Sequence, residues 1–283
     1  MNSTIKLFVD NSKDVNGNNG LHVAVNNNYV QLVKKFVSNE SLVNNTNIHG
    51  QTPFHFAIEK NNYTIINVLI ENDADPEIGK IEKPIHIAAK NGFTSTVETL
   101  VLIGANYHCV NSENKTPLYL AVQNNHYSTA KLLLKCGADP TFMLEYQESM
   151  LVHACKNKNR DLVKLLIDYG LSPNVTYLCG MTVLGKAIMD DDIEIAYHLL
   201  LSGADKFIDA NQTITIEKAL PNIDDKIKYY MKNDDYRPLL HSYYPINTQT
   251  MIFTLLCISL IDDSTLTLNY DILEIIFGFI SFF

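Results

Sequence analysis

The sequence predicts an all-α solenoid of helix-turn-helix repeats, on three observations. A frame ending in alanine recurs with gaps of 33, 31, 33, 33 and 33 residues, at Ala24, Ala57, Ala88, Ala121, Ala154 and Ala187. After each frame come apolar residues at helical spacing, and in the last five units a glycine or aspartate then ends the second helix. A period of this length is typical of repeat proteins, in which each unit buries its apolar face on its neighbours.

The first helix of each unit begins at the frame. In the units that begin Thr52-Pro53 and Thr116-Pro117, threonine can cap the helix and proline fixes its first turn. The turn that follows must be tight, and it needs a residue that tolerates positive φ. The sequence predicts this turn once in each unit, at Asn28, Asn61, Gly92, Asn125, Lys158 and Asp191.

The second helix of each unit carries one apolar stripe. Its residues stand at positions i, i+1, i+4 and i+5, as in Leu162, Val163, Leu166 and Ile167. These signals divide the chain into four parts. We expect an N-terminal capping half-repeat at 1–16, six repeats at 17–206, a decayed repeat with a connecting helix at 207–244, and a helical tail at 245–283.

Composition excludes several classes of function. The net charge is −9 and no lysine or arginine cluster occurs, which argues against binding to nucleic acid or an anionic membrane. The apolar runs 251–261 and 272–283 are shorter than the about 20 residues that span a bilayer. No secretory signal is apparent at the N-terminus. The five cysteines form no CxxC pair, so we expect reduced thiols and no zinc site: Cys109, Cys136, Cys155, Cys179 and Cys257.

Catalytic patterns are absent from the sequence. It holds no glycine-rich phosphate loop, no nucleophile and base at a known spacing, and no metal-ligand cluster. The run Asp190-Asp191-Asp192 lacks the alternating spacing of a calcium loop and is interpreted as a solvated turn. The sequence therefore predicts a protein that is not an enzyme and needs no cofactor.

The frame resembles the ankyrin repeat motif, G-x-T-P-L-H-x-A-A, most clearly at residues 50–57 and 116–121. The resemblance covers about residues 17–205, and it implies an ankyrin-repeat solenoid with β-turn finger loops. It also implies that the histidines at one frame position, His22, His55 and His86, are hydrogen-bonded structural residues. The alternative, metal or acid–base chemistry, is disfavoured because nothing acidic recurs beside them.

Solenoids bind partners through their finger loops and first helices. We expect the fingers at about 44–51, 76–82, 107–115, 141–148 and 174–181. Exposed aromatic side chains on loops are favourable anchors for an interface. The predicted target-binding residues are Tyr107, His108, Phe142, Leu144, Tyr146, Tyr177 and Leu178. The alternative is that some of them pack between adjacent fingers.

The tail segment 268–280 resembles the opening of the F-box, L-P-x-E-I-L-x-x-I-F-x-x-L. Six ankyrin units followed by such a segment resemble the poxvirus ankyrin proteins with a C-terminal PRANC domain. Asn269 replaces the proline of that pattern but can cap a helix instead, and the chain ends at Phe283, before the remaining helices of a full F-box. The resemblance implies binding to host Skp1 through Leu268, Ile272, Leu273, Ile276, Phe277 and Ile280.

Three functions follow as hypotheses. The first is an adaptor in the host cytoplasm that captures a host protein with its repeats and recruits it to a Skp1–cullin-1 ubiquitin ligase, a form of immune evasion. The second is a binding-only inhibitor of host innate signalling or restriction factors, with the tail folded back as a cap on the solenoid. The third is an ankyrin-bearing regulator of an enzyme.

Overall fold

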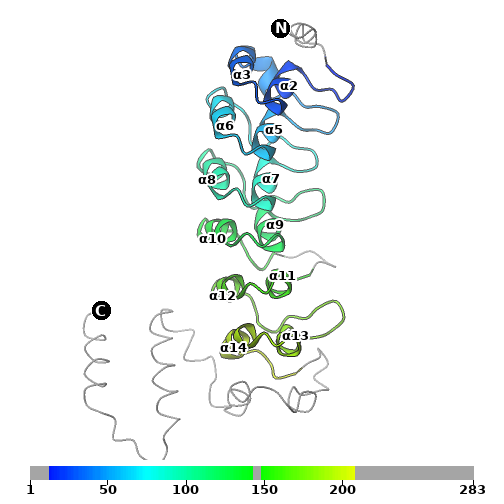
Figure 1. The fold of residues 1–283 in the computed structure, drawn as a ribbon, viewed down its shortest axis with the longest axis vertical. Helices are drawn as coiled ribbons and strands as arrows, with labels where there is room; N and C mark the ends of the chain where they lie inside the picture. Colours follow the sequence, from blue (N-terminus) through cyan, green and yellow to red (C-terminus); the bar gives the residue numbers. More distant parts are fainter. Residues whose placement is uncertain (1–12, 143–147, 208–283) are drawn as a thin grey trace, which may run out of the picture. The chain divides into compact units, whose positions relative to one another are not determined.

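The computed structural model describes residues 13–142 and 148–207 (Figure 1). These residues form six helix pairs and one additional short helix, α4 (Glu40–Val43). The first helices are α2 (Gly20–Asn26), α5 (Pro53–Glu59), α7 (Pro84–Lys90), α9 (Pro117–Gln123), α11 (Met150–Lys156) and α13 (Val183–Met189). The second helices are α3 (Val30–Phe36), α6 (Tyr63–Ile70), α8 (Thr94–Leu102), α10 (Tyr127–Lys135), α12 (Arg160–Asp168) and α14 (Ile193–Leu201).

Successive units stack on one another through like helices. Each first helix contacts the first helix of the next unit, from α2 through α5, α7, α9 and α11 to α13. The second helices form a neighbouring column, in which α8, α10, α12 and α14 contact in turn (Figure 1). Over the described ranges no strand is present, and only an isolated bridge joins Thr176 to Thr182. The predicted all-α solenoid is confirmed.

The first helices begin as predicted from their threonines and prolines. The Thr116 hydroxyl accepts a hydrogen bond from the Tyr119 backbone N–H at 3.1 Å, and the Thr182 hydroxyl accepts one from the Gly185 N–H at 3.0 Å. Pro53, Pro84 and Pro117 stand in the first turn, where the missing N–H costs nothing. A frame threonine or proline therefore marks the helix start in the second, third, fourth and sixth units, whereas Asn19 and Ser149 cap the first helices of the first and fifth units.

All six predicted turn positions have positive φ. The angles are 59°, 49°, 71°, 63°, 51° and 57° at Asn28, Asn61, Gly92, Asn125, Lys158 and Asp191. At Gly92 the positive φ favours glycine, and there is also no room for a side chain. A Cβ there would lie 2.4 Å from Nδ1 of His126. Lys158 adopts the same conformation although lysine has no intrinsic preference for it.

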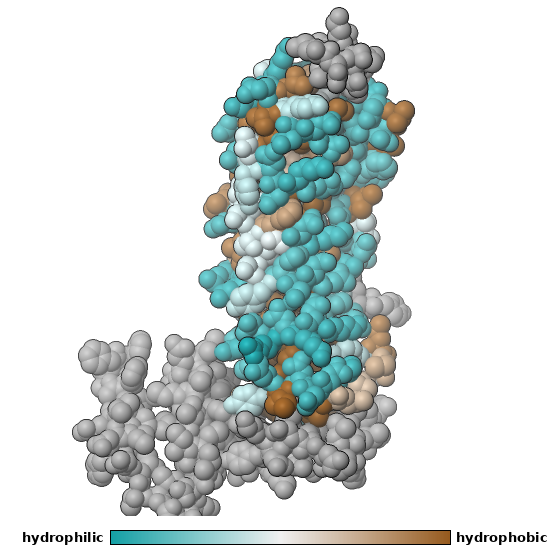
Figure 2. Space-filling model, in the orientation of Figure 1, coloured by the Kyte–Doolittle hydropathy of each residue, from teal (hydrophilic) through white to brown (hydrophobic). Residues whose placement is uncertain are grey.

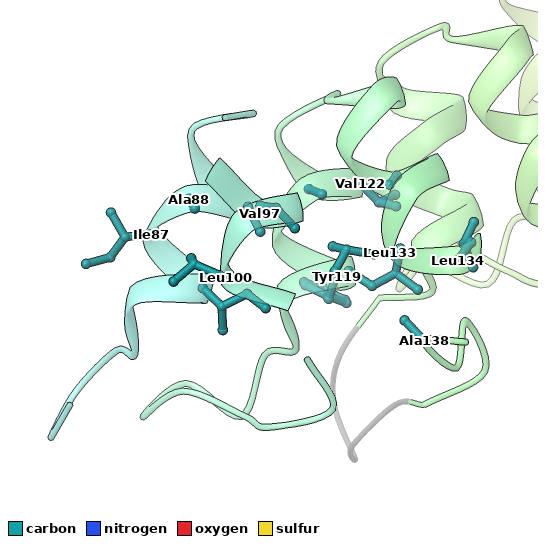
Figure 3. Close-up of a cluster of buried hydrophobic side chains, with 14 of the residues drawn as sticks. Ile87, Ala88, Val97, Leu100, Tyr119, Val122, Leu133, Leu134 and Ala138 are labelled. Atoms are coloured by element: carbon teal, nitrogen blue, oxygen red, sulfur yellow. The ribbon is translucent and has the colours of Figure 1, made fainter. Parts of the chain in front are cut away.

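The core runs without a break from one unit to the next. Figure 3 shows Val97 and Leu100 of α8 together with Tyr119 and Val122 of α9 and Leu133 of α10. Val97, Leu100 and Leu133 are fully buried. Because neighbouring units complete each other's core, each unit depends on its neighbours for stability.

Several sequence predictions fall outside the described residues. These are most of the N-terminal half-repeat, the finger residues 143–147, and everything after residue 207, including the tail helices and the six Skp1 anchors. Within the described ranges, no helix combines the length and the apolar character needed to cross a membrane.

Candidate functional site

The finger loops are held in place by the predicted structural histidines. Nδ1 of His22, His55 and His86 accepts the N–H of the residue that caps its own helix, at 3.2, 3.0 and 3.2 Å. Nε2 donates to a backbone carbonyl of the next unit's finger, at 3.0, 3.0 and 3.2 Å, on Gln51, Glu82 and Cys109. The structural interpretation is confirmed, since each histidine ties one helix to the following finger.

These imidazoles are neutral because they are buried. Burial lowers the pKa of all three, in the case of His55 to about 4. A neutral imidazole has one donor and one acceptor nitrogen, which is what the two hydrogen bonds require. The histidines therefore serve as uncharged bridges and are not set up for acid–base chemistry near neutral pH.

The fourth unit uses a different bridge. Tyr119 replaces the frame histidine, and its hydroxyl lies 2.8 Å from Nε2 of His153 in the fifth unit. The two rings meet edge to face with centroids 5.2 Å apart. His153 stands one position off the frame, so the sequence assigned it no role. In the structure α9 stacks on α11 and brings Tyr119 to His153. This pair connects the fourth unit to the fifth, as the frame histidines connect the earlier units.

The loop at 13–18, which precedes α2 and corresponds to a finger, and the fingers at 44–51, 76–82 and 107–115 touch edge to edge at their tips. The Ile48 N–H donates to the Asn16 carbonyl at 3.0 Å, and the Ser112 N–H donates to the Ile81 carbonyl at 2.9 Å. The second and third tips are equally close, because a Cβ on Gly50 would lie 2.3 Å from Cβ of Lys80. The four tips thus form one continuous edge.

Exposed apolar side chains gather on the fingers. Figure 2 shows hydrophobic side chains along the edge where Figure 1 draws the loops. Six exposed residues of this kind lie in finger loops: Val15, Ile48, Ile81, Val110, Phe142 and Leu178. We call the first four, Val15, Ile48, Ile81 and Val110, the fingertip ridge. The ridge residues were not predicted as binding residues. For Val15 and Ile48 the available signal was an aliphatic residue two positions before a turn glycine, in Val15-Asn16-Gly17 and Ile48-His49-Gly50, whereas Ile81 and Val110 have no such glycine.

The predicted target-binding residues take two kinds of position. His108, Phe142 and Leu178 are exposed, with Leu178 at 78%. Tyr107 and Tyr177 are half-buried against the core. The Tyr107 hydroxyl donates to the Cys136 carbonyl at 2.5 Å, and Lys156 Nζ lies 5.7 Å from the Tyr177 ring centroid. Leu144 and Tyr146 lie outside the described residues.

Four lysines on the fingers and first helices pair with carboxylates. Lys83 contacts Glu77 at 2.6 Å, Lys90 contacts Glu82 at 3.8 Å, Lys115 contacts Glu113 at 2.7 Å and Lys156 contacts Glu148 at 2.5 Å.

The part of the chain that the structure describes holds no group of three potential metal ligands. Burial raises the pKa of the Cys155 thiol to about 12, which keeps that sulfur protonated.

Known protein families and structures agree with this geometry. A model described as "Ankyrin repeats (3 copies)" matches residues 1–80 and 77–143, and one described as "Ankyrin repeat" matches residues 146–175. No curated protein matches the chain in sequence.

Among solved structures, the human ASB11 ankyrin repeat domain is 26% identical, with a TM-score of 0.58 over 69% of this chain and 87% of its own. An ankyrin repeat domain from Acinetobacter baumannii AYE is 27% identical, with a TM-score of 0.60 over 65% and 98%. The ankyrin repeat domain of Bcl-3, a member of the IkappaB protein family, is 22% identical, with a TM-score of 0.62 over 75% and 97%, and shows the shared fold.

Proposed function

Because the chain belongs to the ankyrin repeat family, whose fold is a scaffold for binding other proteins, we propose that it is a substrate adaptor. In this proposal the repeats capture a host protein on the finger surface. The tail recruits Skp1 and cullin-1 in the host cytoplasm. Bringing the two together raises the effective concentration of the captured protein at the ligase.

The observation that carries target capture is the fixed finger surface. The fingers at 44–51, 76–82 and 107–115, the last of which carries Tyr107 and His108, are held by buried histidine bridges and lose little conformational entropy when a partner binds. On the later fingers, Phe142 and Leu178 present apolar side chains to solvent, and the imidazole of His108 is exposed on the finger before them. Apolar and aromatic anchors surrounded by polar residues are typical of protein interfaces.

The ligase half of the proposal is supported by the tail sequence. Residues Leu268, Ile272 and Leu273 stand at the apolar positions of the F-box-like pattern, followed by Ile276, Phe277 and Ile280. Such spacing places one apolar stripe along a helix, which is the form in which an amphipathic helix docks in a groove.

Co-precipitation from host cells tests the ligase half. We expect the wild-type chain to bring down Skp1 and cullin-1, and the double variant Leu273→Asp, Ile276→Asp to bring down neither. The matched control is Leu102→Asp on α8, where an 81% exposed leucine is changed without touching the tail. Absence of Skp1 with the wild type would refute the adaptor. If a host protein were still captured, the binding-only inhibitor would remain.

Target capture has its own test. Replacing Phe142 and Tyr146 with alanine should lower recovery of the captured host protein while leaving Skp1 recovery unchanged. Unchanged recovery of the host protein would show that these fingers are not the capture site.

A further inference from the structure

The chain leaves the sixth unit in the same way as it leaves an earlier one. After α14, Gly203 has a φ of 86° and the N–H of the buried Ala204 donates to the Leu199 carbonyl at 3.0 Å. After α10, Gly137 has a φ of 98° and the Ala138 N–H forms the equivalent hydrogen bond at 3.0 Å. That ending leads into the finger of the next unit, so a further finger is expected after α14.

A hydrogen bond at the base of the fingers supports this continuation. The Asp205 N–H donates to Oδ1 of Asn174, 31 residues earlier, at 2.7 Å. The Asp75 N–H donates to Oδ1 of Asn44, also 31 residues earlier, at 2.9 Å. Asp75 directly precedes the finger of the third unit, and Asp205 stands at the equivalent point after α14.

Thr182 takes the role that the frame histidines have in the first three units. In the sixth unit Gly185 stands at the histidine position and has no side chain with which to form a bridge. The Thr182 hydroxyl accepts the Gly185 N–H at 3.0 Å and donates to the Phe207 carbonyl at 2.6 Å. The first helix of the sixth unit is therefore tied to the chain that follows α14.

Phe207 lies at the expected distance from a seventh frame. It precedes Ala219 by 12 residues, and Cys109, whose carbonyl accepts the bridge to the fourth finger, precedes Ala121 by 12 residues. Ile216 stands three residues before Ala219, a position at which the side chain is at most 1% exposed in all six described units. Its occupants there are Leu21, Phe54, Ile85, Leu118, Leu151 and Leu184.

The sequence after Ala219, outside the described residues, matches a second helix. Asn222 supplies a turn residue that tolerates positive φ, one residue sooner than in the other units because Pro221 ends the first helix early. Ile227 and Tyr230 follow Asn222 by five and eight residues. In the second to sixth units the side chains at these two positions are at most 1% exposed: Ile66, Val97, Ala130, Val163 and Ala196 at the first, and Leu69, Leu100, Leu133, Leu166 and Leu199 at the second.

The charged neighbour of Ile227 supports the same register. Lys228 follows Asn222 by six residues, a position that is exposed in the first five units. Its occupants there are Lys34, Asn67, Glu98, Lys131 and Lys164. Apolar and polar residues thus alternate after Asn222 as they do in the second helices of the array.

We propose that residues 208–232 form a seventh repeat, which docks on the face of α13 and α14 turned away from α11 and α12. Ile216, Ile227 and Tyr230 complete the core of the sixth unit, as each neighbouring unit does elsewhere in the array. The tail at 245–283 is then not needed to cover this face. The inference does not rest on the adaptor proposal, although it leaves the apolar stripe of the tail available for Skp1.

Hydrogen exchange of the full-length chain, followed by mass spectrometry, tests this docking. In the double variant Ile227→Asp, Tyr230→Asp we expect the backbone amides of α14 to exchange about tenfold or more faster than in the wild type, because charged side chains are costly to bury against the sixth unit. The amides of α7 should keep their wild-type rate. Unchanged exchange in α14 would overturn the proposal.

Two further variants keep the test decisive. Lys228→Asp, at the exposed position, should leave the exchange of α14 unchanged, and acceleration equal to that in the double variant would overturn the proposal. If the double variant also accelerates α7, the milder change Ile227→Ala decides. It should accelerate α14 and leave α7 at the wild-type rate, and no acceleration of α14 would count against the docking.

The tail and a second copy of the chain are the competing occupants of this face. Faster exchange of α14 in the variant Leu273→Asp, Ile276→Asp would place the tail there. Exchange of α14 that slows as the protein concentration rises would place a second copy there. Either result would overturn the proposal. Skp1 co-precipitation reports on the tail and hydrogen exchange reports on α14, so this proposal and the adaptor proposal fail separately.

Discussion

Nε2 of His55 donates a hydrogen bond to the carbonyl oxygen of Glu82, 3.0 Å away in the next unit's finger. Nδ1 of the same ring lies 3.0 Å from the Thr52 N–H, which donates to it, and 2.9 Å from the Thr52 hydroxyl. One side chain thus starts its own helix and fixes the following finger. His22 and His86 repeat the arrangement, so the positions of the fingers at 44–51, 76–82 and 107–115 depend on buried neutral imidazoles.

We predict that the array loses stability in acid below about pH 6.5, the ordinary pKa of histidine. Burial lowers the pKa of His55 to about 4 in the folded chain. Between these values the unfolded chain binds the extra proton, so the contribution of His55 to the free energy of unfolding falls as the pH falls and levels off below about pH 4.

For His55 alone the loss amounts to about 3 kcal/mol. The measurement is urea unfolding at several pH values, with a His55→Asn variant as the comparison. A pH dependence as steep in that variant as in the wild type would contradict the assignment to His55.

Gly92→Ala should destabilise the chain more than Gly104→Ala. Both glycines have positive φ, 71° and 91°, so both substitutions carry backbone strain of about 1 kcal/mol. Only at Gly92 would the new methyl group collide with another residue, 2.4 Å from Nδ1 of His126, whereas nothing lies within 4 Å at Gly104. We expect Gly92→Ala to lower the free energy of unfolding by about 1–3 kcal/mol more than Gly104→Ala does, as measured by denaturant unfolding. Equal losses would show that the His126 ring moves aside freely.

Lys158→Asn should stabilise the chain. Lys158 has a φ of 51° in a turn where three other units use asparagine, which adopts that conformation at lower cost. The expected gain in the free energy of unfolding is about 0.5–1 kcal/mol. The control is Lys164→Asn within α12, where helix propensity predicts a small loss instead. A loss of stability at position 158 would show that relief of backbone strain does not govern this turn.

Tyr119→Phe should cost about 1 kcal/mol, because it removes the hydroxyl that pairs with Nε2 of His153 and leaves that nitrogen half-buried without this partner. The same change at Tyr63, which is 40% exposed on α6, should cost less. Thermal unfolding of both variants gives the comparison. Equal shifts in Tm would mean that the bridge between the fourth and fifth units contributes little.

The sequence by itself determined the period, the helix starts and the turns. These are set by local sterics: proline fixes φ at Pro53 and Pro117, while asparagine, glycine and aspartate tolerate positive φ at Asn28, Gly92 and Asp191. Such preferences act within a few residues, so the sequence of one unit shows them without any information on the neighbouring units.

Only the tertiary structure decided which loop side chains face solvent. Tyr107 was predicted to be an exposed anchor, but it is half-buried and its hydroxyl donates to the Cys136 carbonyl. The side chains of Val15, Ile48 and Ile81, which were not predicted, are exposed. His153 likewise gained its partner, Tyr119, from 34 residues away. The physical reason is that exposure and pairing depend on what the neighbouring unit places beside each residue. That depends on how the units stack, which the local preferences of one unit do not specify.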